Sequence, residues 1–138
     1  MRIAFGTDET TPITRGIVGR LQQGGHDVDV LADGDPWPDA GRRVGQAVAG
    51  GRADLGIVCC WTGTGVSIAA NHADHAVRAA LCTDAETARG ARRWNDANVL
   101  ALGLRLTSAV VAVELVDAFL ATATDPDEGP VIARLERH

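Results

Sequence analysis

The sequence has 138 residues and contains neither lysine nor tyrosine, so that all 13 of its basic residues are arginines. The formal net charge is −5 and no basic run occurs, which excludes the broad positive face that non-specific nucleic-acid binding needs. Long apolar runs are also missing, because Asp8 and Glu9 interrupt the opening apolar segment. We therefore expect a cytoplasmic protein that binds neither nucleic acid nor membrane.

Cysteine is scarce and its spacing fits no metal or disulfide pattern. Cys59 and Cys60 are adjacent and Cys82 is the third, an odd set without a Cys-x-x-Cys motif. The closest pair of histidines is His72 and His75, and no further clustered ligand accompanies it. We expect no metal site, with these histidines on a surface turn.

What is present is the composition of a folded domain. Hydrophobic residues make up 46% and charged residues 22%, both ordinary values for a globular chain. The length suffices for one core of normal size. We expect one domain over residues 1–138, with a polar C-terminal tail from about residue 122.

Short, nearly continuous apolar runs alternate with amphipathic segments, which is typical of parallel strands covered by helices on both faces. The strands are predicted at 3–6, 28–31, 55–60, 77–82 and 99–102. The helices are predicted at 12–23, 38–49, 85–93 and 108–121, and a further one begins within 63–70. The pattern predicts an α/β fold, a three-layer αβα Rossmann-like domain with a five-stranded parallel sheet. Such sheets bind ligands beyond the carboxyl ends of their strands.

Two predicted loops at those ends carry unusual residues. The loop after the first strand holds Asp8 and Glu9, although acidic residues near a helix start also have a purely structural explanation. The loop after the third strand runs from Cys60 into Gly63 and Gly65, where backbone N–H groups converge on an anion and favour a thiolate nearby. The lysine of a Walker loop is absent, so a nucleotide site is not predicted.

Three ordered segments, residues 53–57, 60–71 and 95–103, resemble the ribose-5-phosphate isomerase B and galactose-6-phosphate isomerase family. Shorter matches at 35–39, 79–82 and 84–89 extend the likeness, which runs from residue 1 to about 120. The resemblance implies interconversion of aldose and ketose phosphates through an enediol, without metal or organic cofactor. It also implies a homodimer, alone or as half of a tetramer, whose active sites are shared between subunits.

The resemblance assigns roles to individual residues. Cys60 stands where most members carry the cysteine that moves a proton between two sugar carbons, although a small buried thiol is the structural alternative. The predicted catalytic residues are Cys60, Thr62, Asp8 and Asn95, the last supplied by the neighbouring subunit. The predicted substrate-binding residues are Glu9, Trp61, Gly63, Thr64, Gly65, Ser67, Trp94, Arg105 and Arg134. Cys59 and Cys82 are interpreted as core residues.

Several positions depart from the family pattern. Glu9 replaces a histidine that helps to hold the substrate phosphate, and a carboxylate there repels a phosphate. Trp94 replaces the histidine credited with opening the sugar ring, and an indole does not shuttle protons at neutral pH. Trp61 replaces a glycine and either narrows the pocket mouth or offers a stacking face.

This sequence also has fewer of the arginines that hold phosphate in the family. Of the arginine-rich C-terminal stretch at most Arg134 survives, and Val131 stands at a position where the family pattern has an arginine. Arg105 still matches a phosphate-reaching arginine, although a surface ion pair is an equal alternative.

Three functions follow from this pattern. The first is an isomerase or epimerase with the same enediol chemistry, acting on a non-phosphorylated or otherwise altered sugar, for example a short or acyclic one. The second is an ordinary ribose-5-phosphate isomerase B with relocated phosphate ligands such as Arg92, Arg93 or Arg134. The third is a catalytically silent sugar-binding dimer. Joint retention of Asp8 and Cys60 argues for an active enzyme.

Overall fold

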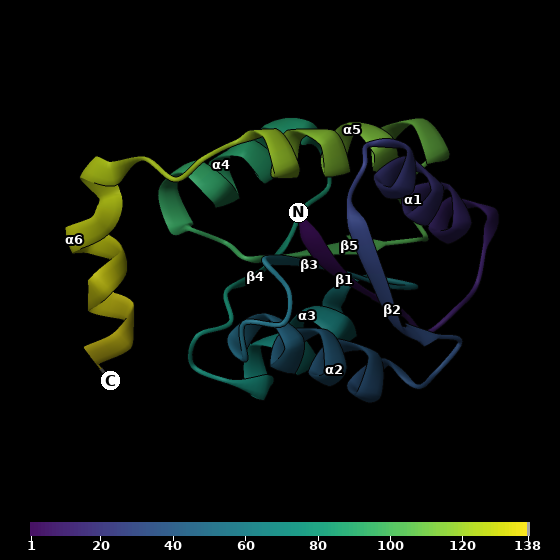
Figure 1. The fold of residues 1–138 in the computed structure, drawn as a ribbon, viewed down its shortest axis with the longest axis horizontal. Helices are drawn as coiled ribbons and strands as arrows, with labels where there is room; N and C mark the ends of the chain where they lie inside the picture. Colours follow the sequence, from purple (N-terminus) through teal and green to yellow (C-terminus); the bar gives the residue numbers. More distant parts are fainter. Residues whose placement is uncertain (138) are drawn as a thin grey trace.

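A computed structural model describes residues 1–137 and contains a five-stranded sheet between two layers of helices (Figure 1). The strands are β1 (Arg2–Thr7), β2 (Asp27–Asp33), β3 (Leu55–Cys60), β4 (Ala79–Leu81) and β5 (Val99–Gly103). All neighbouring strands pair in parallel, in the order β2-β1-β3-β5-β4. The predicted three-layer α/β fold with a five-stranded parallel sheet is confirmed.

Helices cover both faces of this sheet. The main helices are α1 (Pro12–Gln23), α2 (Trp37–Ala49), α3 (Thr64–Ala73), α4 (Ala85–Asn95) and α5 (Ala109–Ala121). Figure 1 shows α1, α4 and α5 on one face and α2 and α3 on the other. The start of α1 is fixed by a reciprocal capping box between Thr11 and Thr14, with Pro12 in the first turn.

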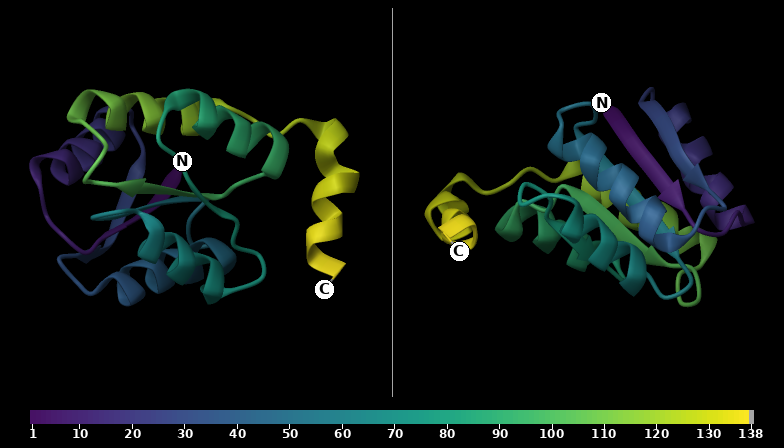
Figure 2. Two further views of the ribbon diagram at one scale, coloured as in Figure 1. Left: turned by 180° about the vertical axis from the view of Figure 1, so that it is seen from behind. Right: turned by 90° about the horizontal axis from the view of Figure 1, so that it is seen from below.

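The structure differs from the sequence prediction at β4 and in the tail. Within the segment predicted as a strand over 77–82, the ladder with β5 comprises Ala79–Leu81. It begins after Arg78, because the N–H of Arg78 donates to the side-chain oxygen of Asn98 at 2.7 Å. The tail forms short helices, η1 (Pro126–Glu128), α6 (Gly129–Ile132) and η2 (Ala133–Arg137). Both views in Figure 2 show this tail standing beside the layered body.

The two faces of β3 separate the adjacent cysteines. Cys59 packs with α1, α4 and α5, and Cys82 belongs to the same core. Cys60 points to the opposite face, in the core under α2 and α3, and is 5% exposed. Burial raises the pKa of the Cys82 thiol to about 11 and that of Cys59 still further above its ordinary value. Cys59 and Cys82 are therefore core residues, as predicted.

Among residues 1–137, no helix has both the length and the apolar character that a membrane crossing needs. The same residues hold no group of three or more histidine, cysteine, aspartate or glutamate side chains suited to a metal ion.

Candidate active site

The candidate site lies where the strand order changes direction, between β1 and β3. Thr7 at the end of β1 pairs with Cys59 near the end of β3. The next N–H, that of Asp8, donates a hydrogen bond to the carbonyl of Cys59 at 3.2 Å. Asp8 and Cys60 therefore lie at neighbouring strand ends, at the topological position where open α/β sheets bind their ligands.

The thiol of Cys60 is held by the turn that follows it. The N–H of Gly63 donates to the Cys60 sulfur at 3.2 Å. Gly63 has φ +78°, and a Cβ atom there would lie 2.5 Å from Cδ1 of Leu81 and 2.8 Å from the backbone nitrogen of Gly103. A glycine is required at this position on both grounds. The turn thus packs over the end of β5 and fixes the sulfur beside the start of α3.

The start of α3 presents hydrogen-bond donors at the same place. The first N–H groups of a helix have no acceptor within the helix, and the N-cap residue Gly63 provides no side-chain oxygen for them. The hydroxyl oxygens of Thr62 and Thr64 lie 2.8 Å apart on the exposed side of the turn, and Ser67 is half-buried one turn further on. This arrangement suits an oxyanion next to the thiol.

The Asp8 carboxylate has an oxygen that accepts no hydrogen bond from the described residues. This atom, Oδ1, is buried. Burial first, and the charge of Glu9 second, raise the pKa of the Asp8 carboxyl above its ordinary value. A buried oxygen of this kind normally has a partner. A sugar hydroxyl is a donor of the right kind.

The surroundings of Asp8 are acidic. Glu9 is exposed in the same loop, and the hydroxyl of Thr10 donates to the carboxylate of Asp33 at the end of β2. The N–H of Asp33 in turn donates to the carboxylate of Asp35 at 3.0 Å. Carboxylates from two adjacent strand ends therefore share this part of the site, and their field opposes an anionic ligand.

Trp37, a residue without a predicted role, packs against the start of α3. A Cβ atom on Gly65 would lie 2.9 Å from Cδ2 and 3.0 Å from Cε3 of the Trp37 ring. The indole therefore packs directly on the glycine at the start of α3. The available signal was the 35–39 turn, which formed part of the family resemblance but carried no assigned chemistry.

Trp61 and Arg105 meet at the other side of the turn. The Trp61 carbonyl accepts from the N–H of Arg105 at 2.8 Å, and the Cys60 carbonyl accepts from the N–H of Leu104 at 2.9 Å. The Trp61 side chain is 57% exposed, and the Arg105 side chain is also exposed. Both side chains are therefore accessible beside the turn that follows Cys60.

Three predicted site residues lie elsewhere in the same chain. Trp94 and Asn95 end α4 and precede β5, so they stand near the amino edge of the sheet, whereas Cys60 ends β3 at the carboxyl edge. The length of β5 alone separates these edges by roughly 13 Å. Arg134 lies in η2 of the tail. A single chain thus assembles the thiol, the turn and Asp8, but leaves Asn95 outside.

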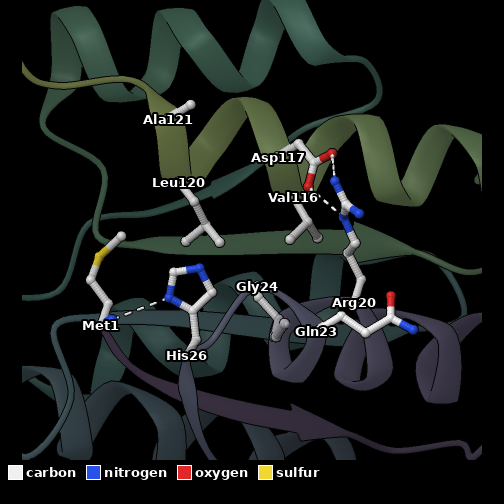
Figure 3. A pocket seen from close by; sticks show the side chains of 10 residues that line it. Met1, Arg20, Gln23, Gly24, His26, Val116, Asp117, Leu120 and Ala121 are labelled. Atoms are coloured by element: carbon white, nitrogen blue, oxygen red, sulfur yellow. Dashed lines mark hydrogen bonds and ion pairs between the residues drawn. The ribbon is translucent and has the colours of Figure 1, made fainter.

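A cavity of about 420 Å³ lies at the amino ends of β1 and β2 (Figure 3). It is lined by residues such as Met1, Arg20, His26 and Asp117, with the Arg20 guanidinium paired to Asp117 at 2.9 Å. None of the predicted site residues lines it. This cavity is therefore separate from the candidate active site.

Comparison with known proteins gives consistent matches along the chain. The sequence profile of the family described as Ribose/Galactose Isomerase matches residues 3–137. Ribose-5-phosphate isomerase B of Escherichia coli K12 is 40% identical over 126 residues, which cover 86% of this chain and 83% of that protein. D-erythrulose-4-phosphate isomerase of Pectobacterium atrosepticum is 33% identical over 126 residues, covering 87% and 82%.

The fold comparison agrees with these matches. The structure of ribose-5-phosphate isomerase B from Clostridium thermocellum superposes with a TM-score of 0.89 at 35% identity. The superposition covers 98% of this chain and 95% of that one. The likeness thus extends over the sheet, both helical layers and most of the tail.

Proposed function

The chain belongs to the Ribose/Galactose Isomerase family of sugar-phosphate isomerases, and from this premise we propose that it interconverts an aldose and a ketose with Cys60 as the base. The observation that carries the proposal is the Cys60 sulfur, which accepts from the Gly63 N–H beside the donors at the start of α3. Asp8, with its unpartnered oxygen, supplies the adjacent contact to substrate hydroxyls.

The proposed reaction moves one proton between neighbouring carbons. The Cys60 thiolate removes the proton from the carbon next to the carbonyl, and the electron pair of that C–H bond forms the carbon–carbon double bond of the enediolate. The carbonyl oxygen becomes the anion, which the donors of residues 62–65 stabilise. The thiol then returns the proton to the former carbonyl carbon, and the hydroxyl and oxyanion exchange a proton. No oxidant or reductant is consumed.

The substrate that fits this site best is an open-chain sugar with a neutral end. Glu9 is exposed next to Thr10, whose hydroxyl donates to the Asp33 carboxylate, and the N–H of Asp33 donates to the Asp35 carboxylate. These carboxylates oppose a phosphate at the end of β1. Trp94 cannot supply the proton transfers of ring opening. A short or acyclic sugar without a terminal phosphate needs neither group.

A four-carbon sugar phosphate is the second candidate. One relative is a D-erythrulose-4-phosphate isomerase, and Arg105 is exposed beside the Trp61 turn. In a tetrose 4-phosphate the hydroxyl that would close a five-membered ring is esterified, so this substrate is also open-chain. The ordinary pentose-phosphate assignment is weaker, because Arg92 is only 15% exposed and donates to the carbonyls of Thr122 and Ala97.

We further propose that the active form is a homodimer. In the proposed dimer, a two-fold axis lies beside the edge strand β4 and is perpendicular to the strands, so the strands of the two subunits run in opposite directions. The amino edge of one sheet, with Trp94 and Asn95, then faces the carboxyl edge of the other, with Cys60. A groove of about 620 Å³ follows this edge, lined by Leu81 and Trp94 among others. The tail adds Val131 and Leu135, both exposed. Exposed apolar side chains along one edge support burial against a second copy.

The test is turnover of four sugars, D-glyceraldehyde, D-erythrose 4-phosphate, D-ribose and D-ribose 5-phosphate, followed by NMR as aldose becomes ketose. We expect D-glyceraldehyde, which is too short to close a five-membered ring, to be converted most efficiently, and D-ribose 5-phosphate poorly. Efficient conversion of D-erythrose 4-phosphate alone would favour the second candidate. If D-ribose 5-phosphate exceeds all others, the open-chain proposal is wrong. Sedimentation equilibrium of the same sample is expected to give a dimer.

A further inference from the structure

Three segments of the chain meet at Asp96, the residue that follows Asn95. Asp96 ends α4 in the left-handed conformation, with φ +48°, and is the one non-glycine residue with positive φ among those described. Its N–H donates to the carbonyl of Ala91, which closes the helix. A side chain is rarely accommodated in this conformation unless its surroundings hold it there.

The Asp96 carboxylate is held from two directions. Its Oδ2 accepts from Nη2 of Arg78 at 3.0 Å, and its Oδ1 accepts from the hydroxyl of Thr124 at 2.8 Å. The backbone carbonyl of Asp96 also accepts from Nε of Arg78 at 2.7 Å. One residue thereby connects the entry to β4, the end of α4 and the beginning of the tail.

A second arginine ties the tail to the same place. Arg92 Nε donates to the carbonyl of Thr122 at 3.1 Å, and Arg92 Nη1 lies 3.5 Å from Oδ1 of Asp96. Its guanidinium carbon lies 5.5 Å from the centre of the Phe119 ring. The N–H of Asp125 donates to the carbonyl of Arg93 at 2.9 Å. Charge-assisted bonds in a partly buried network are stronger than exposed ones.

We propose that Asp96 is a positioning residue that couples the first residues of the tail to the orientation of Asn95. The inference rests on the proposed function, in which Asn95 completes the site of the partner subunit. Asn95 is exposed and directly precedes Asp96, so its direction depends on the backbone of Asp96. That backbone is fixed by Arg78 and, through the carboxylate, by Thr124. The same network sets the direction in which the tail leaves the body.

The coupling is tested without any substrate, by hydrogen exchange of the full chain. Thr124→Val removes the hydroxyl donated to Asp96, and Thr124→Ser restores a hydroxyl. Thr122→Val is the matched control, because the Thr122 hydroxyl donates within its own helix end, to the carbonyl of Ala118. We expect Thr124→Val to raise exchange roughly tenfold both at residues 93–98 and at residues 122–128, since bonds to charged groups contribute about a factor of ten or more.

The serine variant is expected to exchange like the unmodified protein, and Thr122→Val to leave residues 93–98 unchanged. Faster exchange of Thr124→Val in the tail alone, with residues 93–98 unaffected, would overturn the coupling. This result would leave the proposed isomerase function intact, because no step of the reaction uses Thr124.

A double-mutant cycle tests whether Asp96 acts through Asn95. Asp96→Asn is introduced into the unmodified chain and into Asn95→Ala, and kcat and KM are measured with D-glyceraldehyde. We expect kcat to fall roughly tenfold in the first background and less than twofold in the second, with smaller changes in KM. An equal loss of kcat in both backgrounds would mean that Asp96 has a general structural role. This result would overturn the coupling of Asp96 to Asn95 and leave the proposed isomerase function intact. A fully active Asn95→Ala variant would contradict the shared site itself.

Discussion

The indole of Trp37 packs on Gly65 so closely that an added Cβ would lie 2.9 Å from the ring. Gly65→Ala is therefore expected to push α2 away from the start of α3. The turn that holds the Cys60 sulfur ends at this point. Overpacking of this kind costs about 1–3 kcal/mol of unfolding free energy. Turnover is expected to fall as well, because the donors at the start of α3 move. Urea unfolding and initial rates measure the two effects.

The matched control is Gly16→Ala in α1, where nothing lies within 4 Å of the added Cβ. This change is expected to stabilise the protein slightly, by about 0.5–1 kcal/mol. Trp37→Leu in the Gly65→Ala background is expected to recover part of the lost stability. Unchanged stability and turnover in Gly65→Ala would contradict the packing of Trp37 on this glycine.

Asp8 is expected to lower stability at neutral pH while it supports activity. Burial and Glu9 raise its folded pKa above the ordinary 3.8, so the folded state disfavours the carboxylate. Protonated Asp8 therefore contributes to the free energy of unfolding. This contribution is fully present below about pH 3.8 and is lost as the pH rises through the pKa of Asp8 in the folded protein. Asp8→Asn is therefore expected to raise Tm at pH 7, with the gain vanishing toward pH 3.

The same variant is expected to lose at least about tenfold in kcat/KM, because the amide is a weaker acceptor for sugar hydroxyls. Asp29→Asn, which removes an exposed carboxylate on β2, serves as the control for net charge. A lower Tm in Asp8→Asn at pH 7 would mean that the Asp8 carboxylate stabilises the fold.

The sequence predicted the sheet because each central strand is a short apolar run bounded by turn residues. The start of α1 was equally predictable, since Thr11 and Pro12 are cap residues whose preference is local. The start of β4 was not, because the N–H of Arg78 is bound by Asn98, 20 residues further along the chain. Local patterns do not contain such contacts.

The site was predictable only in part for the same reason. Asp8 follows a predicted strand and Cys60 ends one, and parallel topology places both at the same edge of the sheet. That β1 and β3 are neighbours follows from the strand order, which the local pattern does not contain. The contact of Trp37 with Gly65 joins two helices that the pattern does not pair. The network around Asp96 depends on a positive φ and on the path of the tail, neither of which has a periodic signature.

Glu9→His is expected to improve the binding of phosphorylated sugars. Replacing a carboxylate by an imidazole removes a repulsion worth about 1 kcal/mol in water-like surroundings, or roughly a fivefold lower KM for D-erythrose 4-phosphate. The gain is expected to shrink as salt rises, because Glu9 is exposed. Glu114→His on the exposed side of α5 has the same change in net charge and serves as control. An equal gain in both variants would contradict a local role of Glu9.

Mixing two variants of strongly reduced activity is expected to restore activity. Cys60→Ala retains Asn95 and Asn95→Ala retains Cys60, so each mixed dimer contains one intact site if the sites are shared. An equimolar mixture after subunit exchange is expected to reach about a quarter of the unmodified activity. Mass spectrometry of the mixture verifies exchange. Mixed dimers without activity would mean that Asn95 does not complete the site of the partner.

The most direct test of the role of Cys60 is proton exchange at the carbon next to the carbonyl, followed by NMR in heavy water with D-glyceraldehyde. Cys60→Ala removes the base and is expected to slow deuterium uptake by about 10²–10⁴-fold. Cys59→Ala and Cys82→Ala alter buried core thiols and are expected to retain uptake while lowering stability. Uptake by folded Cys60→Ala within tenfold of the unmodified protein, or equal losses in all three variants, would contradict the role of Cys60.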